Sequence, residues 1–321
     1  MTPSGRKIPF GPRLPAVAMG GRQMELLLRS FDKACPGRVR TGEPMARHTT
    51  IAAGGPARFF AVPKSRREVV SLVRAALKHE IDYIAIGKGS NLLVRDGGFN
   101  GLVIKFGSDM AGLTVFKRTA YAEAGASFTH VGKVLTRSGR VGFEFAVGIP
   151  GSVGGAVRMN AGAWGSDVAG VLESVRLVDE RGRLAVLGVA EMGLGYRTSS
   201  LPPRSIVLSA IFNCPAGAID EEKLKRSLNR AETQPLSQRS FGSAFKNPAG
   251  GHAGRMIDEC GLKGTRRGGV MVSDKHANFL VNVGENTKAN DIEDLLGWIA
   301  ERVETRFQVA LTPEVIIIGD R

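Results

Sequence analysis

The chain has 321 residues and a formal net charge of +14, with 43% apolar and 23% charged residues. This composition is typical of a globular protein with enough apolar residues for a large core, and it excludes a disordered or fibrous chain. There is no apolar run that could span a bilayer and no signal-peptide core, so we expect no membrane association.

The three cysteines, Cys35, Cys214 and Cys260, are widely spaced and form no C-x-x-C pair. This spacing argues against disulfides and zinc and fits a reducing compartment, so we expect a cytoplasmic protein. The five histidines are scattered, and we expect no metal site. Bases crowd only residues 1–45, which we predict to be a basic tail with one short helix over residues 23–33. Elsewhere they are dispersed, so we expect no nucleic-acid partner.

The segment of residues 46–110 begins with Thr49–Phe60, which predicts a short strand that ends at a Gly-Gly-Pro turn and then resumes. Ser65 and Glu68 form a capping box ahead of an amphipathic helix. The turn G-K-G-S-N, Gly87–Asn91, then lies between two short apolar strands. Because a strand follows this turn in place of a helix, it is not the G-x-G-x-x-G dinucleotide fingerprint.

Short strands and few long helices also mark residues 111–214, and this pattern favours an α+β fold over a doubly wound sheet. The charged turn at residues 180–183 predicts a hairpin. The elements expected here are a strand at Tyr121–Ala124, a helix at His130–Leu135, hairpin strands at Val175–Asp179 and Leu184–Val186, and a strand at Ile206–Phe212.

The composition shifts near Pro215, and we predict a second lobe over residues 215–310. A charged helix over Asp220–Ala231 is followed by a polar loop, Gln234–Pro248, that has no acidic residue. Asn290 and Glu293 predict a capping box for a long helix. A last apolar strand within residues 311–321 is expected to return to the interface between the lobes.

The most informative stretch is Val147–Gly165, which has six glycines and no acidic residue. Glycine allows a positive φ and lets a ligand approach the backbone closely. Successive free N–H groups form anion-binding concavities, so this stretch could cradle a diphosphate. The alternative is a tight loop packed against a neighbouring strand. The basic surroundings and the second glycine-rich turn at residues 87–91 favour the ligand site.

Three polar residues are candidates for chemistry. Arg197 follows Tyr196 in a polar loop, and Ser243 lies in the polar loop of residues 234–248; a surface arginine and a turn serine are the commoner explanations. Glu314 stands at the mouth of an apolar strand, where a carboxylate needs a partner. Spacing alone does not connect these three residues.

Six stretches, taken together and in order, carry a resemblance to a known family. With them the chain resembles the UDP-N-acetylenolpyruvoylglucosamine reductases over roughly residues 49–319, in the shorter type that lacks a tyrosine-bearing insertion. The stretches are G-K-G-S-N-L-L-V, G-I-P-G-S-V-G-G-A-V-x-M-N-A-G-A-W-G, G-Y-R-x-S, G-S-x-F-K-N-P, K-H-A-N-F-L-V-N and L-x-P-E-V.

The resemblance implies an α+β fold: an FAD-binding part of the vanillyl-alcohol-oxidase type with two subdomains, residues 46–110 and 111–214, and a C-terminal substrate-binding domain. It also implies FAD as cofactor and NADPH as co-substrate. Residues 87–91 offer no His, Cys or Tyr for attachment, so we expect non-covalent FAD. The expected partners are small molecules, with no obligate protein partner.

The implied reaction reduces the enolpyruvyl ether of a UDP-sugar to UDP-N-acetylmuramate, a peptidoglycan precursor. Hydride passes from flavin N5 to C3 and a proton from Ser243 to C2, while Arg197 polarises the enolpyruvyl group with Glu314 as its partner. Lys246, Asn247 and His276 are the expected substrate contacts. The expected cofactor contacts are Gly87, Lys88, Gly89, Ser90, Asn91, Leu92, Gly125, Ala126, Gly148, Ile149, Pro150, Gly151, Ser152, Gly154, Gly155, Ala156, Asn160 and Gly162.

Two departures from the family pattern flank Ser243: Phe241 stands where a small residue is usual, and Ala244 where a bulkier one is. A ring at Phe241 could reshape the loop that aims the Ser243 hydroxyl. Two other classes of protein remain as alternatives. One is a flavin-dependent oxidase of the same fold superfamily, and the other is a basic nucleotide-binding protein without catalysis.

Overall fold

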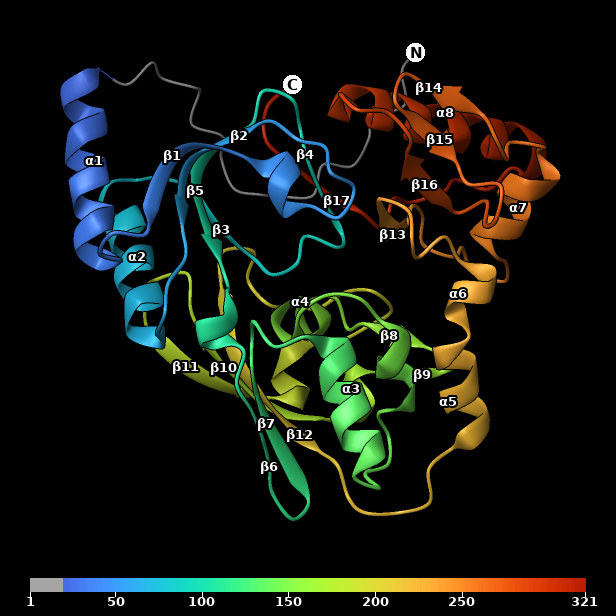
Figure 1. The fold of residues 1–321 in the computed structure, drawn as a ribbon, viewed down its shortest axis with the longest axis horizontal. Helices are drawn as coiled ribbons and strands as arrows, with labels where there is room; N and C mark the ends of the chain where they lie inside the picture. The colour runs from blue at the N-terminus through green and yellow to red at the C-terminus, as the bar shows by residue number, and fades with distance from the viewer. Residues whose placement is uncertain (1–19) are drawn as a thin grey trace.

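The computed structural model describes residues 20–321 and arranges them as three lobes, each built on its own sheet (Figure 1). The first lobe lies at the upper left of this view, the second at the bottom and the third at the upper right. The part of the predicted basic tail before residue 20 lies outside the described residues. From residue 20 onward, no helix is long and apolar enough to cross a membrane.

The first lobe has a sheet of order β1-β2-β5-β3, in which β5 runs parallel to both of its neighbours. Helices α1 and α2 pack against each other beside it (Figure 1). Its elements are α1 (Gly21–Ala34), β1 (Val39–Pro44), β2 (Pro56–Ala61), α2 (Arg66–Lys78), β3 (Tyr83–Ile86), β4 (Leu92–Val94) and β5 (Phe99–Lys105).

The second lobe has an antiparallel sheet of order β11-β10-β12-β7-β6. The pairing of β10 with β11 confirms the predicted hairpin. The elements of this lobe are β6 (Leu113–Val115), β7 (Thr119–Glu123), α3 (Phe128–Arg137), α4 (Val153–Arg158), β8 (Gly162–Ala163), β9 (Ser166–Asp167), β10 (Leu172–Val178), β11 (Leu184–Gly188) and β12 (Ile206–Asn213).

The third lobe has an antiparallel sheet of order β13-β16-β15-β14, against which α8 packs. The last strand, β17, leaves this lobe and pairs in parallel with β4, with Ile316 beside Leu92 (Figure 1). The elements are α6 (Arg230–Thr233), β13 (Ser240–Ser243), α7 (Ala253–Glu259), β14 (Arg266–Arg267), β15 (Val270–Val272), β16 (Phe279–Asn282), α8 (Ala289–Phe307) and β17 (Ile316–Ile318). The preceding helix, α5 (Glu221–Leu228), packs on the second lobe against residues 144–148, so the third lobe begins after the predicted boundary at residue 215.

The N-terminal segment belongs to the first lobe from α1 onward, which corrects the prediction of a tail up to residue 45. The predicted short helix is present, and Leu27 and Phe31 on it are buried. The Phe31 ring packs edge-on against Phe59, with centroids 5.0 Å apart. Residues 39–44 then form β1 along β2. The sequence did not indicate this edge strand because most of its side chains are exposed and only its backbone joins the sheet.

Two further predicted segments differ. The strand expected at residue 49 is absent, because Met45–His48 forms a 3-10 helix and the strand begins only at Pro56. The loop predicted over residues 234–248 contains β13, on which Phe241 is 1% exposed. This strand is only four residues long and depends on pairing with the distant β16, so no local pattern indicates it.

The long helix α8 is present as predicted, but its cap comes from another lobe. Its own N-cap side chain makes no capping bond. Instead the Asp96 carboxylate accepts hydrogen bonds from Ala289 N at 2.9 Å and from Asn290 N at 3.0 Å. Glu293, the predicted capping partner of Asn290, pairs with Arg95 through two contacts of 2.8 and 3.0 Å. The segment after β4 therefore anchors the third lobe.

Replacing Asp96 with alanine is expected to lower the free energy of unfolding by about 0.5–2 kcal/mol, the usual cost of a lost helix cap. Replacing Asn290 with alanine is the matched control. Its side chain is exposed and gives no cap, so we expect a change within about 0.5 kcal/mol. Chemical denaturation of both variants measures the difference, and equal losses would contradict the assignment of the cap to Asp96.

Candidate active site

The glycine-rich stretch of residues 147–165, here called the cradle, wraps around the start of α4. Ser152 caps this helix, and its hydroxyl accepts a hydrogen bond from Gly155 N at 3.5 Å. Gly154 N donates to Ala124 O at 2.9 Å, which fixes the cradle onto the end of β7. Gly125 and Ala126, two predicted cofactor contacts, directly follow Ala124 and therefore lie against the cradle.

The first glycine-rich turn, residues 87–91, meets the cradle face to face. A Cβ atom at Gly87 would lie 2.0 Å from Ser152 Oγ, so only glycine allows this approach. The Ser90 hydroxyl donates to Pro150 O at 3.4 Å. Two turns that are 60 residues apart in sequence thus lie against each other.

The chemistry of the two facing turns fits the diphosphate of a dinucleotide. Gly155 is exposed between the half-buried Gly154 and the buried Ala156, and a Cβ added there would meet only Ser152 Oγ, 3.6 Å away. The Lys88 ammonium stands beside it, donating to Ser127 Oγ at 2.8 Å. Backbone that carries no Cβ, close to a lysine, lets phosphate oxygens approach it. These residues fit FAD.

Asn160 does not fit this role, which corrects its prediction as a cofactor contact. The residue is 1% exposed. Its amide nitrogen donates to Asp167 Oδ2 at 2.9 Å and to Gly195 O at 3.0 Å, and its amide oxygen accepts from Ala169 N at 2.9 Å. The side chain therefore binds the protein itself.

The three candidate catalytic residues come together at the junction of the lobes. Arg197 Nε donates to Glu314 Oε1 at 2.9 Å. Glu314 N donates to Ala244 O at 2.9 Å, which places the Glu314 backbone beside the residue that follows Ser243. Asn91, in the first glycine-rich turn, donates to Glu314 O at 3.1 Å. Arg197 and Glu314, which spacing alone does not connect, are thus in direct contact, and Ser243 precedes the residue that bonds Glu314 N.

Burial raises the pKa of Glu314 above its ordinary value, and the positive charges of Arg197, Lys246 and Arg230 oppose this effect. The Arg197 side chain is only 22% exposed and that of Glu314 17%. In an ion pair so shielded from water the Coulombic attraction is strong, and removing one partner leaves the other charge buried without compensation.

Arg230, on α6, is a member of this site that the sequence analysis missed. Its Nη1 donates to Gly148 O of the cradle at 2.9 Å. Burial and then the nearby charge of Arg197 lower the pKa of Arg230. An arginine in a charged helix is predicted to be a surface residue. Its place in the site is shown only by its contact with a carbonyl of the cradle.

The predicted substrate contacts lie on the third-lobe side of the site. Lys246 Nζ donates to Arg197 O at 3.2 Å, and Asn247 N donates to the Tyr196 hydroxyl at 3.4 Å. A pocket of about 630 Å³ opens here, lined by Tyr196 and residues 247–252. His276 is half-buried, and burial together with the charge of Lys263 lowers its pKa.

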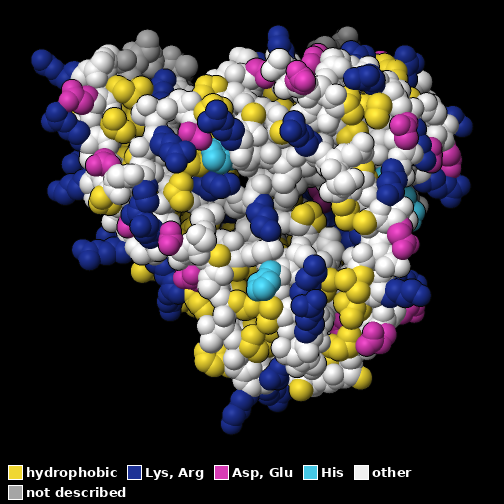
Figure 2. All heavy atoms as spheres, viewed as in Figure 1, with side chains coloured by type: hydrophobic (Ala, Val, Ile, Leu, Met, Phe, Trp, Pro, Cys, Tyr) yellow, Lys and Arg dark blue, Asp and Glu magenta, His cyan; other side chains and the backbone are white. Residues whose placement is uncertain are grey.

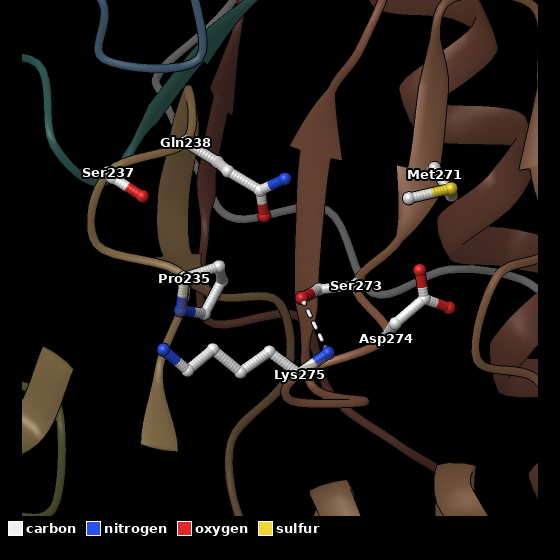
Figure 3. Close-up of a pocket in the computed structure, with 7 residues that line it drawn as sticks. All are labelled: Pro235, Ser237, Gln238, Met271, Ser273, Asp274 and Lys275. Carbon is white, nitrogen blue, oxygen red and sulfur yellow. Dashed lines mark hydrogen bonds between the residues drawn. The ribbon is translucent and has the colours of Figure 1, made fainter. Parts of the chain in front are cut away.

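A second pocket, of about 290 Å³, lies in the third lobe between the loop before β13 and the turn from β15 to β16 (Figure 3). Lys275 extends past Pro235 in this view, and its ammonium donates to Ala231 O of α6, next to Arg230. The lining residues are Pro235, Ser237, Gln238, Met271, Ser273, Asp274 and Lys275.

The face in Figure 2 is hollowed near its centre, between the lobes. Lys and Arg side chains are spread over this face with Asp and Glu among them, and they gather in no single patch. Among residues 20–321, no three His, Cys, Asp or Glu side chains lie close enough together to hold a metal ion.

Comparison with known proteins explains this arrangement. Residues 57–188 match the FAD binding domain model, and residues 234–318 match the model of the UDP-N-acetylenolpyruvoylglucosamine reductase C-terminal domain. The UDP-N-acetylenolpyruvoylglucosamine reductase of Streptococcus thermophilus is 44% identical over 289 residues, which cover 88% of this chain and 94% of that protein. The chain belongs to the UDP-N-acetylenolpyruvoylglucosamine reductase family.

Other members of the UDP-N-acetylenolpyruvoylglucosamine reductase family agree. The Bacillus pumilus reductase is 39% identical over 304 residues, covering 92% of this chain and 99% of the relative. The crystal structure of the reductase from Thermus caldophilus superposes with a TM-score of 0.75 at 34% identity, covering 88% of this chain and 99% of that one. The predicted family, fold class and FAD cofactor are confirmed, and the C-terminal match decides against the oxidase and non-catalytic alternatives.

Proposed function

We propose that this chain reduces the enolpyruvyl ether of UDP-N-acetylglucosamine-enolpyruvate to UDP-N-acetylmuramate, with Arg197, Ser243 and Glu314 as its catalytic residues. The main support is the 2.9 Å ion pair between Arg197 and Glu314, which joins the second lobe to the strand end beside Ser243. The pair adjoins the first glycine-rich turn, because the Asn91 side chain of that turn donates to Glu314 O.

The chemistry that FAD supplies when bound is hydride transfer, from NADPH to the enolpyruvyl double bond. Arg197 binds the enolpyruvyl carboxylate, where negative charge develops during the reaction. A guanidinium held in place by Glu314 and by Gly162 O, at 2.7 Å, stabilises that charge more in the transition state than in the ground state.

Ser243 donates the proton that completes the reduction at C2. A hydroxyl has a high pKa, so it acts as an acid only toward a strong carbon base formed beside it. Gly242, with φ +83°, turns the end of β13 and presents the next residue at the junction of the lobes. The Phe241 ring is buried in the hydrophobic core of the third lobe.

Lys246, Asn247 and His276 are the proposed substrate contacts. Lys246 donates to Arg197 O, and Asn247 lines the 630 Å³ pocket together with Tyr196. The remaining cofactor contacts proposed from the resemblance, apart from Asn160, lie on the two facing glycine-rich segments and at residues 125–126. All three cysteines are free thiols, which supports a cytoplasmic location.

Purified protein incubated with FAD, NADPH and the UDP-enolpyruvyl sugar should consume NADPH, followed by nicotinamide absorbance. The matched control is UDP-N-acetylglucosamine, which lacks the enolpyruvyl ether and should cause no consumption beyond slow oxidation by oxygen. Flavin-loaded protein that oxidises NADPH equally with both sugars would contradict the proposed substrate.

Substituting Gly155 with alanine tests where the cofactor binds. Gly155 and Gly297 both lie within helices, α4 and α8, and a Cβ at either meets no tight protein contact. Each alanine is therefore expected to raise the free energy of unfolding of the apoprotein by about 0.5–1 kcal/mol. Only Gly155→Ala should also weaken FAD binding, measured by flavin fluorescence titration. Unchanged FAD affinity in Gly155→Ala would exclude this face of α4 as the binding surface.

A further inference from the structure

The turn that carries Arg197 has a strained backbone. Gly195 and Thr198 exchange two backbone hydrogen bonds of 3.1 and 3.2 Å, so residues 195–198 form a tight closed turn. Within it Arg197 has φ +54°, in the left-handed region that a side chain with a Cβ rarely adopts. Such a conformation persists only where the surrounding structure fixes it.

The side chain of Asn160 supplies that fixation. Its amide nitrogen donates to Gly195 O at 3.0 Å, and the same carbonyl accepts from Thr198 N, so Asn160 holds the base of the turn. The amide is itself fixed by Asp167 and by Ala169 N at 2.9 Å each. With 1% exposure, no water replaces these bonds.

The neighbours of Asn160 hold the same loop at two more places. Gly162 O accepts from Arg197 Nη2 at 2.7 Å. Arg158, at the end of α4, donates to Ser205 Oγ at 3.0 Å and to Pro202 O at 3.0 Å, farther along the loop. Residues 158–162 of the cradle thus bind the loop of residues 195–205 before, at and after Arg197.

We propose that Asn160 is a positioning residue for Arg197: it links the FAD cradle to the turn that aims the guanidinium at the substrate. This inference rests on the proposed role of Arg197 in the reaction. It assigns to Asn160 an effect on reduction of the enolpyruvyl substrate and none on FAD binding, because every polar atom of its side chain is bonded within the second lobe.

The test compares Asn160→Asp with the double variant Asn160→Asp/Asp167→Asn. Aspartate keeps the shape, the acceptor for Ala169 N and the tolerance of Asn160 for φ +41°, but it loses both donated bonds. In the double variant the amide introduced at position 167 donates back to the carboxylate at position 160. It restores that contact and removes the charge repulsion, while the Gly195 carbonyl still lacks its side-chain donor.

Both variants, as flavin-loaded protein, are assayed for FAD affinity, melting temperature, flavin reduction by NADPH, and flavin reoxidation by the UDP-enolpyruvyl sugar. We expect the double variant to recover the melting temperature and to bind FAD and accept NADPH like the wild type. Its reoxidation by the sugar should remain about 10- to 100-fold slow, the effect of misaligning a catalytic group by roughly 1 Å.

Two results would overturn the inference. Reoxidation that recovers together with the melting temperature would make Asn160 merely structural, and a loss of FAD affinity in the stable double variant would make it a cofactor contact. Arg197→Lys, measured in parallel, distinguishes an error in the role of Asn160 from an error in the proposed role of Arg197. If Arg197→Lys also reoxidises at the wild-type rate, the role of Arg197 is wrong, whereas if it alone is slow, only the role of Asn160 is wrong.

Discussion

Replacing Ser243 with alanine is expected to leave flavin reduction by NADPH at the wild-type rate and to slow flavin reoxidation by the UDP-enolpyruvyl sugar by about 10²–10⁴-fold, the range for loss of a general acid. The reason is that only the second half of the reaction leaves a carbanion-like centre that needs a proton. Rapid mixing with absorbance detection of the flavin measures both rates separately.

Ser240→Ala is the matched control, because Ser240 begins the same strand, β13, and its carbonyl accepts the Thr50 hydroxyl at 2.6 Å. Loss of the Ser240 side chain leaves that backbone contact in place, so both rates should stay near those of the wild type. If Ser243→Ala reoxidises as fast as Ser240→Ala, the proton comes from elsewhere and Ser243 is not the acid.

The strand β13 could not be predicted from its local sequence pattern. Within residues 240–243 the one large apolar residue, Phe241, stands between polar residues and a glycine, so the local pattern predicts a loop. Pairing with β16 and the bond from Glu314 N to Ala244 O make it an ordered strand end. Both partners are far away in the sequence, and only the resemblance in motif order anticipated that these segments meet.

The elements that depend on local chemistry were predictable. Glycine-rich turns, the Ser65 cap of α2 and the hairpin of β10 and β11 follow from residues near one another in sequence. Asp96 and Arg230 were given no role from the sequence, and Asn160 was predicted as a cofactor contact, since a carboxylate, an amide or a guanidinium can serve a helix end, a turn or a ligand equally well. Their roles are decided by the atoms opposite them, which belong to other segments.

Replacing Arg197 with methionine, which keeps much of the side-chain length without the charge, is expected to lower the rate of flavin reoxidation by the sugar by about 10²–10³-fold, the loss for one preorganised transition-state donor. The same change leaves Glu314 buried without its cation. Because burial already raises the pKa of Glu314, the carboxyl should then take up a proton at a still higher pH.

A double-mutant cycle with Glu314→Gln tests whether the two residues act as one unit. If they do, Glu314→Gln alone also slows reoxidation, and Arg197→Met/Glu314→Gln is little slower than the slower single variant.

The pH dependence gives a second check. With a raised folded pKa, Glu314 stabilises the fold only while protonated, so wild-type stability falls as pH rises through that pKa, while activity, which needs the carboxylate, rises. Both pH effects should vanish in Glu314→Gln. Two results together would show that the pair does not work as a unit. The rate losses of the single variants would multiply in the double variant, and Glu314→Gln would keep the wild-type rise of activity with pH.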